Sequence, residues 1–159
     1  MLLVLILLGV ISSVVSQQCE CGIFIVRARD VNGIPTDKSS ELWRLSTTPS
    51  SGCSASEAIT CENNCIQTFR NWKANNNMYS LIPGDANNRD YGNYFCASTG
   101  TVLPPGYAPE ALHQNPSCYD WISSTEYDPR QNLCCSADTW NFWDCPYDGN
   151  AVATTPIPL

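Results

Sequence analysis

Ten cysteines constrain the fold of this 159-residue chain more than any other feature of its sequence. Their number is even, and cysteines that share an oxidising compartment form disulfides by default. We therefore predict five disulfide bonds and no free thiol, rather than a zinc site. The cysteines are Cys19, Cys21, Cys53, Cys61, Cys65, Cys96, Cys118, Cys134, Cys135 and Cys145.

Three pairs of neighbouring cysteines are poorly placed to bond to each other. Cysteines two residues apart on a strand lie on the same face, but their side chains point in parallel directions and so do not meet. Adjacent residues point to opposite faces of an extended segment, and residues four apart on a helix face one way together. Each such cysteine is expected to bond to another element, with the pairing left open. The three pairs are Cys19 and Cys21, Cys134 and Cys135, and Cys61 and Cys65.

An apolar N-terminal segment precedes all ten cysteines. Residues Met1–Ser16 are mostly apolar and carry no charged side chain. The segment is shorter than the about 20 residues that a bilayer core requires. It is typical of a secretory signal peptide, with small residues Val14 and Ser16 before the cleavage site, whereas the alternative is a buried strand. We predict a signal peptide over residues 1–16, a mature chain that begins at Gln17, no membrane span and an extracellular location.

The clearest helical pattern runs from Ser54 or Ser56 to about Ala74. A serine at the N-cap accepts a hydrogen bond from the free amides, and Glu57 lies early, where the helix dipole favours an anion. The face expected to pack on the core carries residues at helical spacing. These residues are Ala58, Cys61, Cys65, Phe69 and Trp72.

Short strands are predicted around this helix. β-branched and aromatic residues favour a strand over residues 23–26, and polar–apolar alternation favours another over residues 41–45. Ser, Thr, Pro and Gly indicate a loop over residues 46–56. Further extended segments are expected at 78–83, 94–96, 118–122 and 132–135. Four prolines within Gly100–Pro116 indicate an irregular loop there.

These patterns predict a small disulfide-rich α+β domain, with one main helix packed on short antiparallel strands and many loops. The domain is expected to occupy residues 17–148. Residues 149–159 contain neither cysteine nor charge and are predicted to be a disordered tail.

The charge balance excludes one group of partners. Eight Lys and Arg residues stand against 15 Asp and Glu residues, which gives a net charge of −7. Binding to nucleic acid or to an anionic membrane needs clustered cations, so we expect neither. The expected partners are extracellular proteins or glycans, with disulfide cross-links between chains as one route into a matrix.

An Asx-rich segment resembles the beginning of a calcium loop. Asp85, Asn87 and Asp90 would supply the oxygen ligands that Ca²⁺ requires. The segment lacks the glycine at the sixth position and the glutamate at the twelfth position of an EF-hand. Turns without metal have the same composition, so we interpret the segment as a turn and predict no metal site.

The other titratable residues do not predict catalysis. Asp120, Glu126 and Asp128 lie near Trp121, and two carboxylates are the minimum for glycoside cleavage. Fifteen acidic residues place three within ten positions by chance. His113, the single histidine, lies in the proline-rich segment and is expected to be solvated, with no free thiol to activate. We predict no catalytic residue and no cofactor.

Aromatic residues gather near the C-terminal cysteines. One prediction is that they form a surface that stacks on sugar rings or anchors a partner protein. The alternative is that they pack over the C-terminal disulfides. These candidate binding residues are Trp140, Phe142, Trp143 and Tyr147.

The cysteine spacing, with the residues between the cysteines, resembles one known family. Cys-x-Cys-Gly-x-Phe over residues 19–24 is followed by Cys53 and by Cys-x-Asn-x-Cys over residues 61–65. Cys-x-Asp-Trp-Ile over residues 118–122 then leads to Leu-Cys-Cys over 133–135 and Cys-Pro over 145–146. In this order the chain is similar to the follicle cell protein 3C family, although residues 84–115 are longer than that family's usual spacing.

This resemblance implies a small secreted cysteine-rich arthropod protein linked to follicle cells and so to the eggshell, and it implies no catalytic residue. We therefore expect a secreted, non-enzymatic structural or interaction protein, such as an eggshell or extracellular matrix component. The alternative is a soluble secreted effector: a ligand-binding factor, a venom component, or a protease inhibitor with Gly100–Pro116 as its inhibitory loop.

Overall fold

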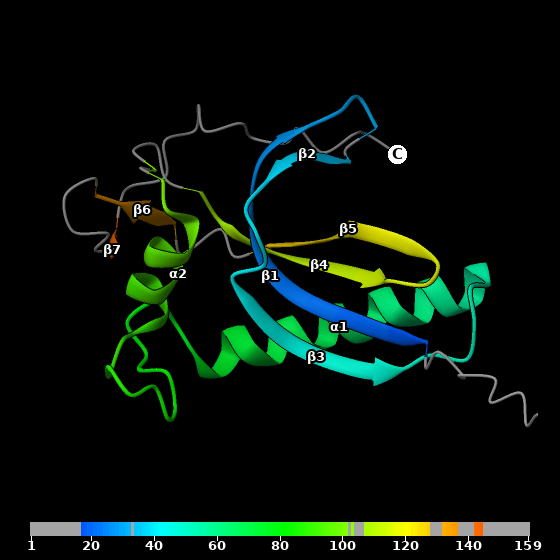
Figure 1. Cartoon of the computed structure of the whole chain (residues 1–159), viewed down its shortest axis with the longest axis horizontal. Coiled ribbons are helices and arrows are strands. Elements are labelled where there is room, and N and C mark those ends of the chain that lie inside the picture. The colour runs from blue at the N-terminus through cyan, green and yellow to red at the C-terminus, as the bar shows by residue number, and fades with distance from the viewer. Residues whose placement is uncertain are drawn as a thin grey trace, which may run out of the picture.

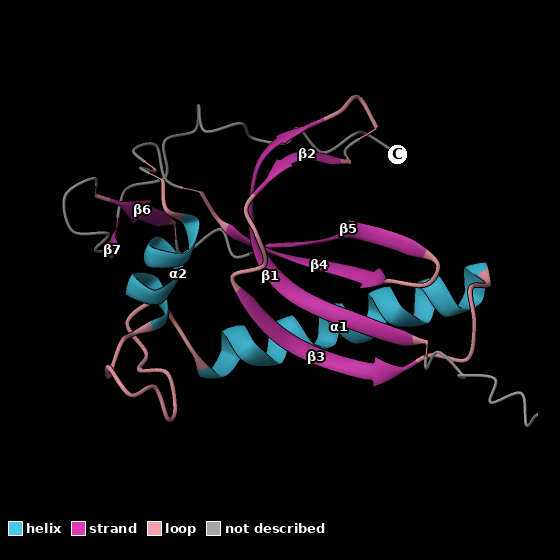
Figure 2. Ribbon diagram, in the orientation of Figure 1, coloured by secondary structure: helices cyan, strands magenta, loops and turns pink. Residues whose placement is uncertain are grey.

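The computed structural model describes residues 17–32, 34–101, 103, 107–127, 132–136 and 142–144. A sheet of antiparallel strands lies against the long helix α1, and α2 packs beside the small β6–β7 pair (Figure 1, Figure 2). The fold confirms the predicted class, a small disulfide-rich α+β domain with one main helix. In chain order the elements are β1 (Gln18–Arg29), β2 (Pro35–Lys38), β3 (Trp43–Pro49), α1 (Ala55–Asn75), α2 (Tyr91–Thr99), β4 (Pro109–Asn115), β5 (Tyr119–Tyr127), β6 (Leu133–Cys135) and β7 (Phe142–Asp144).

The long strand β1 organises the sheet. On one side, β2 pairs with residues 26–29 of β1 and β3 pairs with residues 18–23. On the other side, β4 pairs with residues 20–25, and β5 lies beyond β4. The segment between β2 and β3 stays attached, because the amides of Ser39 and Leu42 donate to carbonyls of β1 at 2.8 Å. Residues far apart in sequence are thereby brought into one sheet.

The core lies between the sheet and α1. Cys21, Ile23 and Ile25 alternate along β1, and each is at most 1% exposed. From α1, Cys65 and Phe69 contribute side chains that are fully buried in the same cluster. Period-two alternation on the strand and the helical period on α1 therefore bring their apolar faces together.

Helix α1 begins where the sequence predicts. Ser54 is the N-cap: its hydroxyl accepts a hydrogen bond from the amide of Glu57 at 3.3 Å. The Glu57 carboxylate in turn accepts one from the Ser54 amide at 3.1 Å. This reciprocal capping box satisfies two amides that the helix itself cannot. The helix ends at Asn75, one residue beyond the predicted end.

Four disulfides each join two different elements, as the cysteine placement predicts. Two bind β1 to α1, one binds the segment before α1 to the β4–β5 turn, and one binds α2 to β6. The pairs are Cys19–Cys61, Cys21–Cys65, Cys53–Cys118 and Cys96–Cys135. Cys134 is disulfide-bonded as well, whereas Cys145 lies outside the described residues.

The predicted extended segment at 94–96 is wrong, because it belongs to helix α2. Asp90 is the N-cap, and its carboxylate accepts a hydrogen bond from the Asn93 amide at 2.7 Å. Gly100 ends the helix at φ 58°, a left-handed conformation that glycine adopts without strain. The apolar side chains recur at helical spacing and reach the core. They are Tyr91, Phe95 and Cys96.

The irregular loop predicted for Gly100–Pro116 is also wrong, because residues 109–115 form β4. Pro109 is the first residue of this strand, where a missing N–H is tolerated. The strand lies between β1 and β5, and six of its seven residues are buried. Its polar side chains find hydrogen-bond partners on other elements, which a reading of local sequence cannot detect.

Other predictions are confirmed in part. The strands at 23–26, 118–122 and 132–135 overlap β1, β5 and β6, whereas β3 continues through Pro49 into the predicted loop. The segment 78–83 forms only an isolated bridge between Leu81 and Asp90. The predicted signal peptide (1–16) and the predicted tail (149–159) lie outside the described residues.

Candidate functional site

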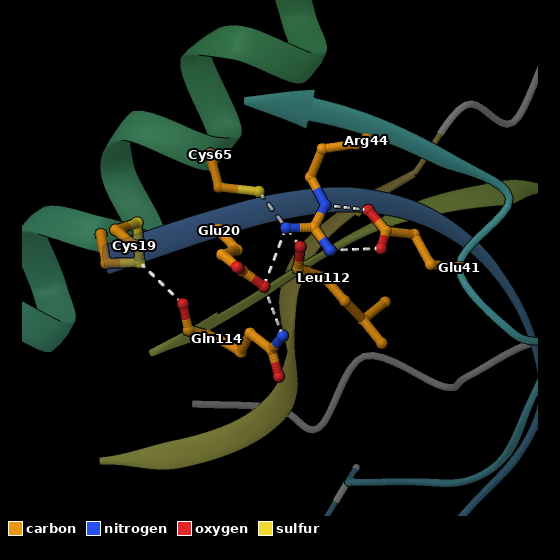
Figure 3. Close-up of polar contacts among 8 residues, drawn as sticks. Cys19, Glu20, Glu41, Arg44, Cys65, Leu112 and Gln114 are labelled. Carbon is orange, nitrogen blue, oxygen red and sulfur yellow. Dashed lines mark hydrogen bonds and ion pairs between the residues drawn. A yellow bond between two sulfur atoms is a disulfide. The ribbon is translucent and has the colours of Figure 1, made fainter. Parts of the chain in front are cut away.

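A cluster of polar side chains lies on the face of the sheet opposite α1. Side chains alternate along a strand, so the bridges from Cys19 and Cys21 to α1 place Glu20, between them, on the other face. Gln114 of β4 lies directly opposite Glu20. Figure 3 shows how residues from several strands converge here. We call the following residues the sheet-face cluster: Glu20, Glu41, Arg44, Gln114 and Trp121.

Arg44 is the centre of this cluster. Its Nη1 lies 2.8 Å from Oε2 of Glu20, and its Nε and Nη2 both donate to the carboxylate of Glu41 (Figure 3). Gln114 Nε2 donates to the same Glu20 oxygen at 2.6 Å. Bonding to Glu41, opposed by partial burial and reinforced by Glu20, raises the pKa of the Arg44 guanidinium above its ordinary value. The guanidinium therefore stays charged and fixed.

An aromatic ring extends the cluster. The Cζ of Arg44 lies 5.3 Å from the centroid of the Trp121 ring, within the range of a cation–π contact. The Trp121 ring also packs on Phe24, with centroids 4.8 Å apart, and Phe24 is only 2% exposed. The Arg44 side chain is 40% exposed. The cluster is thus partly exposed to solvent on one side and packs on buried apolar side chains on the other.

The cluster is suited to recognition. Both carboxylates bind one guanidinium, so Glu20, Glu41 and Arg44 together carry a single negative charge. What remains is a fixed set of hydrogen-bonding groups beside an aromatic ring. Sequence reasoning did not identify Glu20, Glu41 or Arg44. The available signals were the position of Glu20 between two bridging cysteines and the spacing of Glu41 and Arg44.

In the predicted acidic group near Trp121, the two described carboxylates, Asp120 and Glu126, bind different cations. Glu126 binds Arg70 at 3.0 Å and Lys73 at 2.9 Å, both on α1. Partial burial raises the pKa of the Glu126 carboxyl, but the hydrogen bonds from Arg70 and Lys73 outweigh it and hold the pKa below its ordinary value. A glycosidase acid needs the opposite shift. Asp120 is 84% exposed beside Lys38, and Asp128 lies outside the described residues.

The Asx-rich segment forms a turn, as interpreted from the sequence. The Asp85 carboxylate accepts hydrogen bonds from the amides of Asn87 and Arg89, each at 3.0 Å. The Arg89 guanidinium binds the same carboxylate, and together with the backbone it lowers the pKa of Asp85 to about 2. Asp90 caps α2 instead. Both carboxylates thus bind groups of the chain itself, Asp85 within the turn and Asp90 at the beginning of α2.

The expectation that His113 is solvated is wrong. The residue lies on β4 and is 2% exposed, with Nδ1 2.9 Å from the Ser124 hydroxyl oxygen and the ring edge-on to Tyr119 at 5.8 Å. Burial lowers the pKa of His113 to about 4, so the imidazole is neutral at pH 7. Residues 109–115 form the strand β4, so this part of Gly100–Pro116 is not the exposed loop that an inhibitor would require.

Of the aromatic residues predicted as a binding surface, Phe142 is the one whose side chain the structure describes. Its ring packs against the core and lies 5.0 Å from the ring of Tyr79. This contact agrees with packing over the fold rather than with a free surface. Trp143 lies in β7, and Trp140 and Tyr147 lie outside the described residues.

Within the described part of the chain, every cationic side chain forms an ion pair. A phosphate would therefore compete with a carboxylate for each of these cations. The pairs are Arg27–Asp37, Arg29–Glu110, Lys38–Asp120, Arg44–Glu20, Arg44–Glu41, Arg70–Glu126, Lys73–Glu126 and Arg89–Asp85.

Among the described residues, neither helix combines the length and apolar character that crossing a membrane requires. In the same residues, no three His, Cys, Asp or Glu side chains gather as metal ligands would. Comparison with protein families, with curated proteins and with solved structures finds no match to this chain. The geometry of the fold therefore carries the functional argument.

Proposed function

We propose that this chain is a secreted, non-enzymatic structural or interaction protein, and that it serves as an eggshell or extracellular matrix component. One observation carries the proposal: each of the four described disulfides ties together two different elements of the fold. Such a framework is typical of extracellular proteins, because disulfides form and persist in oxidising compartments and are rare in reducing ones.

The disulfides suit a protein that must last in place. A bridge of this kind contributes typically about 2–4 kcal/mol, largely by restricting the unfolded chain. Four bridges distributed over β1, α1, α2, β6 and the β4–β5 turn leave few elements able to open independently. A rigid fold of this type supports a permanent contact better than a cycle of conformational change.

The sheet-face cluster is the surface that we propose for partner binding. Its carboxylate, amide and guanidinium groups lie beside the Trp121 ring and face away from α1. Such groups hydrogen-bond to the peptide groups of a protein or to the hydroxyls of a glycan. The paired charges favour polar partners over anionic polymers.

We also propose membership of the follicle cell protein 3C family, on the spacing motifs alone. Two of those motifs, Cys-x-Cys over residues 19–21 and Cys-x-Asn-x-Cys over residues 61–65, are disulfide-bonded to each other. The spacing of the two motifs therefore has a physical explanation, because each motif supplies the cysteines with which the other forms disulfides.

A soluble secreted effector is the second candidate, and the disulfide pattern offers it some support. In the structure, the eight cysteines of the four described bridges all pair within the chain. A chain whose bridges are internal is able to act as a free monomer, as a ligand-binding factor does.

Extraction of the native protein from the tissue that produces it separates the two candidates. Parallel samples are taken up in saline with and without a thiol reductant, and the soluble fractions are compared by mass and by size. We expect the protein to remain insoluble in saline and to appear after reduction. A protein that dissolves in saline as a monomer contradicts the matrix role and favours the effector.

A further inference from the structure

The four described disulfides differ in how far solvent reaches them. Six of their cysteines are at most 5% exposed, which covers both bridges between β1 and α1 and the bridge between α2 and β6. In the remaining bridge, Cys53 is exposed and Cys118 is half-buried. This bridge lies at the edge of the fold, between the segment before α1 and the β4–β5 turn.

Exposure decides which disulfide exchanges first. A thiolate must reach a sulfur atom before a new disulfide can form. At the three buried bridges, that approach requires local or global opening of the fold, and the free energy of opening limits the rate. Cys53 is exposed, so burial of this kind does not oppose the approach to it. The bridge Cys53–Cys118 is thus chemically distinct from the other three.

Opening this bridge leaves its surroundings held by hydrogen bonds. The Ser50 amide donates to the carbonyl of Gln17 at 2.9 Å. Asn115 Nδ2 donates to the Gly52 carbonyl and to the Ser50 hydroxyl oxygen, each at 3.3 Å. The capping box at Ser54 then fixes the beginning of α1. The three buried bridges hold the core meanwhile, so the fold survives the exchange.

We propose that Cys53–Cys118 is a thiol–disulfide exchange site that joins this chain covalently to another thiol-bearing secreted protein. The partner's thiolate attacks Sγ of Cys53 and forms a new disulfide. The Cys53–Cys118 bond breaks, and Cys118 leaves as a thiolate that takes a proton from water. One disulfide replaces another, so the step needs no oxidant. The assignment of the partner to a matrix rests on the proposed function, whereas the exchange does not.

The site is tested on the purified, secreted, full-length chain under native conditions. Reduced glutathione at about pH 8, near the thiol pKa, serves as the probe, and iodoacetamide quenches samples at intervals before peptide mapping. We expect glutathione on Cys53 and alkylation of Cys118 at least about tenfold faster than any change at the buried bridges. Equal rates at all bridges, or earlier change at Cys96 or Cys135, overturn the proposal.

Two variants sharpen the test. Cys118→Ser removes the thiol that can reverse the exchange, so we expect a persistent glutathione adduct or a disulfide-linked dimer through Cys53. The matched double variant C53S/C118S should keep its other bridges and form neither product. An adduct that persists in the double variant contradicts the assignment. If the variants are not secreted, the wild-type rates decide the matter alone.

These results are independent of the extraction experiment. Exchange confined to Cys53 and Cys118, together with a protein soluble in saline, would retain the exchange site and reject the matrix role. Uniform exchange, together with a protein that needs reductant for extraction, would retain the matrix role and reject this site.

Discussion

Buried polar residues on β4 connect parts of the chain that are far apart in sequence. Glu110, 6% exposed, binds the guanidinium of Arg29 on β1. His113 hydrogen-bonds to Ser124 on β5, and Asn115 bonds to the segment before α1. A buried polar group without a partner would cost about 1–3 kcal/mol. These polar residues, like the apolar residues of β4, therefore help to determine which strands and segments pack against it.

His113 should make the stability of the fold depend on pH. Its folded pKa, about 4, lies below the ordinary 6.5. Between these values the unfolded chain binds a proton that the folded chain does not. The free energy of unfolding therefore falls as the pH falls from about 6.5 to about 4, by about 3 kcal/mol, and the contribution is complete above pH 6.5.

Urea unfolding midpoints across this pH range measure the effect. His113→Gln should remove the part of the slope due to histidine, while the carboxylates contribute equally in both proteins. Because the chain has a single histidine, the difference in slope is specific. Identical slopes for wild type and variant would show that His113 titrates normally in the fold.

Gly92 should resist substitution because of one contact. A Cβ on Gly92 would lie 2.3 Å from Cγ of Phe142, so Gly92→Ala forces the ring or α2 to move. We expect a loss of about 1–3 kcal/mol in the free energy of unfolding, despite the gain of about 1 kcal/mol in helix propensity. Chemical denaturation measures it. The double variant with Phe142→Ala should cost less than the sum of the two single changes, whereas additive effects would exclude the clash.

At the scale of elements, two residues of β1 span about the same length as four residues of α1. Two strand residues advance about 6.6–6.8 Å, and four helix residues advance about 6 Å. A Cys-x-Cys strand beside a Cys-x₃-Cys helix therefore brings two pairs of sulfurs together at once. Both bridges form, Cys19 with Cys61 and Cys21 with Cys65, so the order of bonding runs in the same direction along both elements.

The capping box should contribute measurably to α1. Ser54→Ala removes the hydroxyl that accepts a hydrogen bond from the Glu57 amide, and we expect a loss of about 1 kcal/mol in the free energy of unfolding. Thr60→Ala removes an exposed hydroxyl of α1 that donates to the Ser56 carbonyl rather than to the Ser54 or Glu57 side chain; it is the matched control and should change it by less than about 0.5 kcal/mol. Equal losses for the two variants would mean that the cap is not the cause.

At the scale of the whole molecule, the disulfides connect nearly every layer of the fold. β1, α1, α2, β6 and the β4–β5 turn each carry at least one bridge. The sheet-face cluster depends on the pairing of strands, because four of its residues lie on β1, β3, β4 and β5 and meet only when these strands are aligned.

The bridge pattern is the most direct check of the whole fold. Non-reducing mass spectrometry should find a mass ten hydrogens below that of the reduced chain, consistent with five disulfides. Peptide mapping should return the four pairs seen in the structure, and the fifth bond then requires the two cysteines that remain, Cys134 and Cys145. A bond between Cys19 and Cys21, or a free thiol, would contradict the fold.

Local physical chemistry allowed several elements to be predicted from the sequence. The N-cap serine, the early Glu57 and the apolar period of 3.6 residues are contained within one segment, so α1 was predicted closely. Cysteine parity and spacing likewise predicted bridges between elements. The same kind of signal was present for α2, in Asp90 and Gly100, although the Tyr-Phe-Cys segment at 94–96 favoured an extended conformation.

Only the tertiary structure decided the rest. The strand β4 is polar and proline-flanked, and it is stable there because β1, β5 and the segment before α1 satisfy its buried groups. The choice among possible cysteine pairings depended on which elements pack side by side. The sheet-face cluster and the exposed position of Cys53–Cys118 have the same cause. Contacts between residues distant in sequence stabilise the protein only once the chain has folded. No single segment therefore contains the information that specifies them.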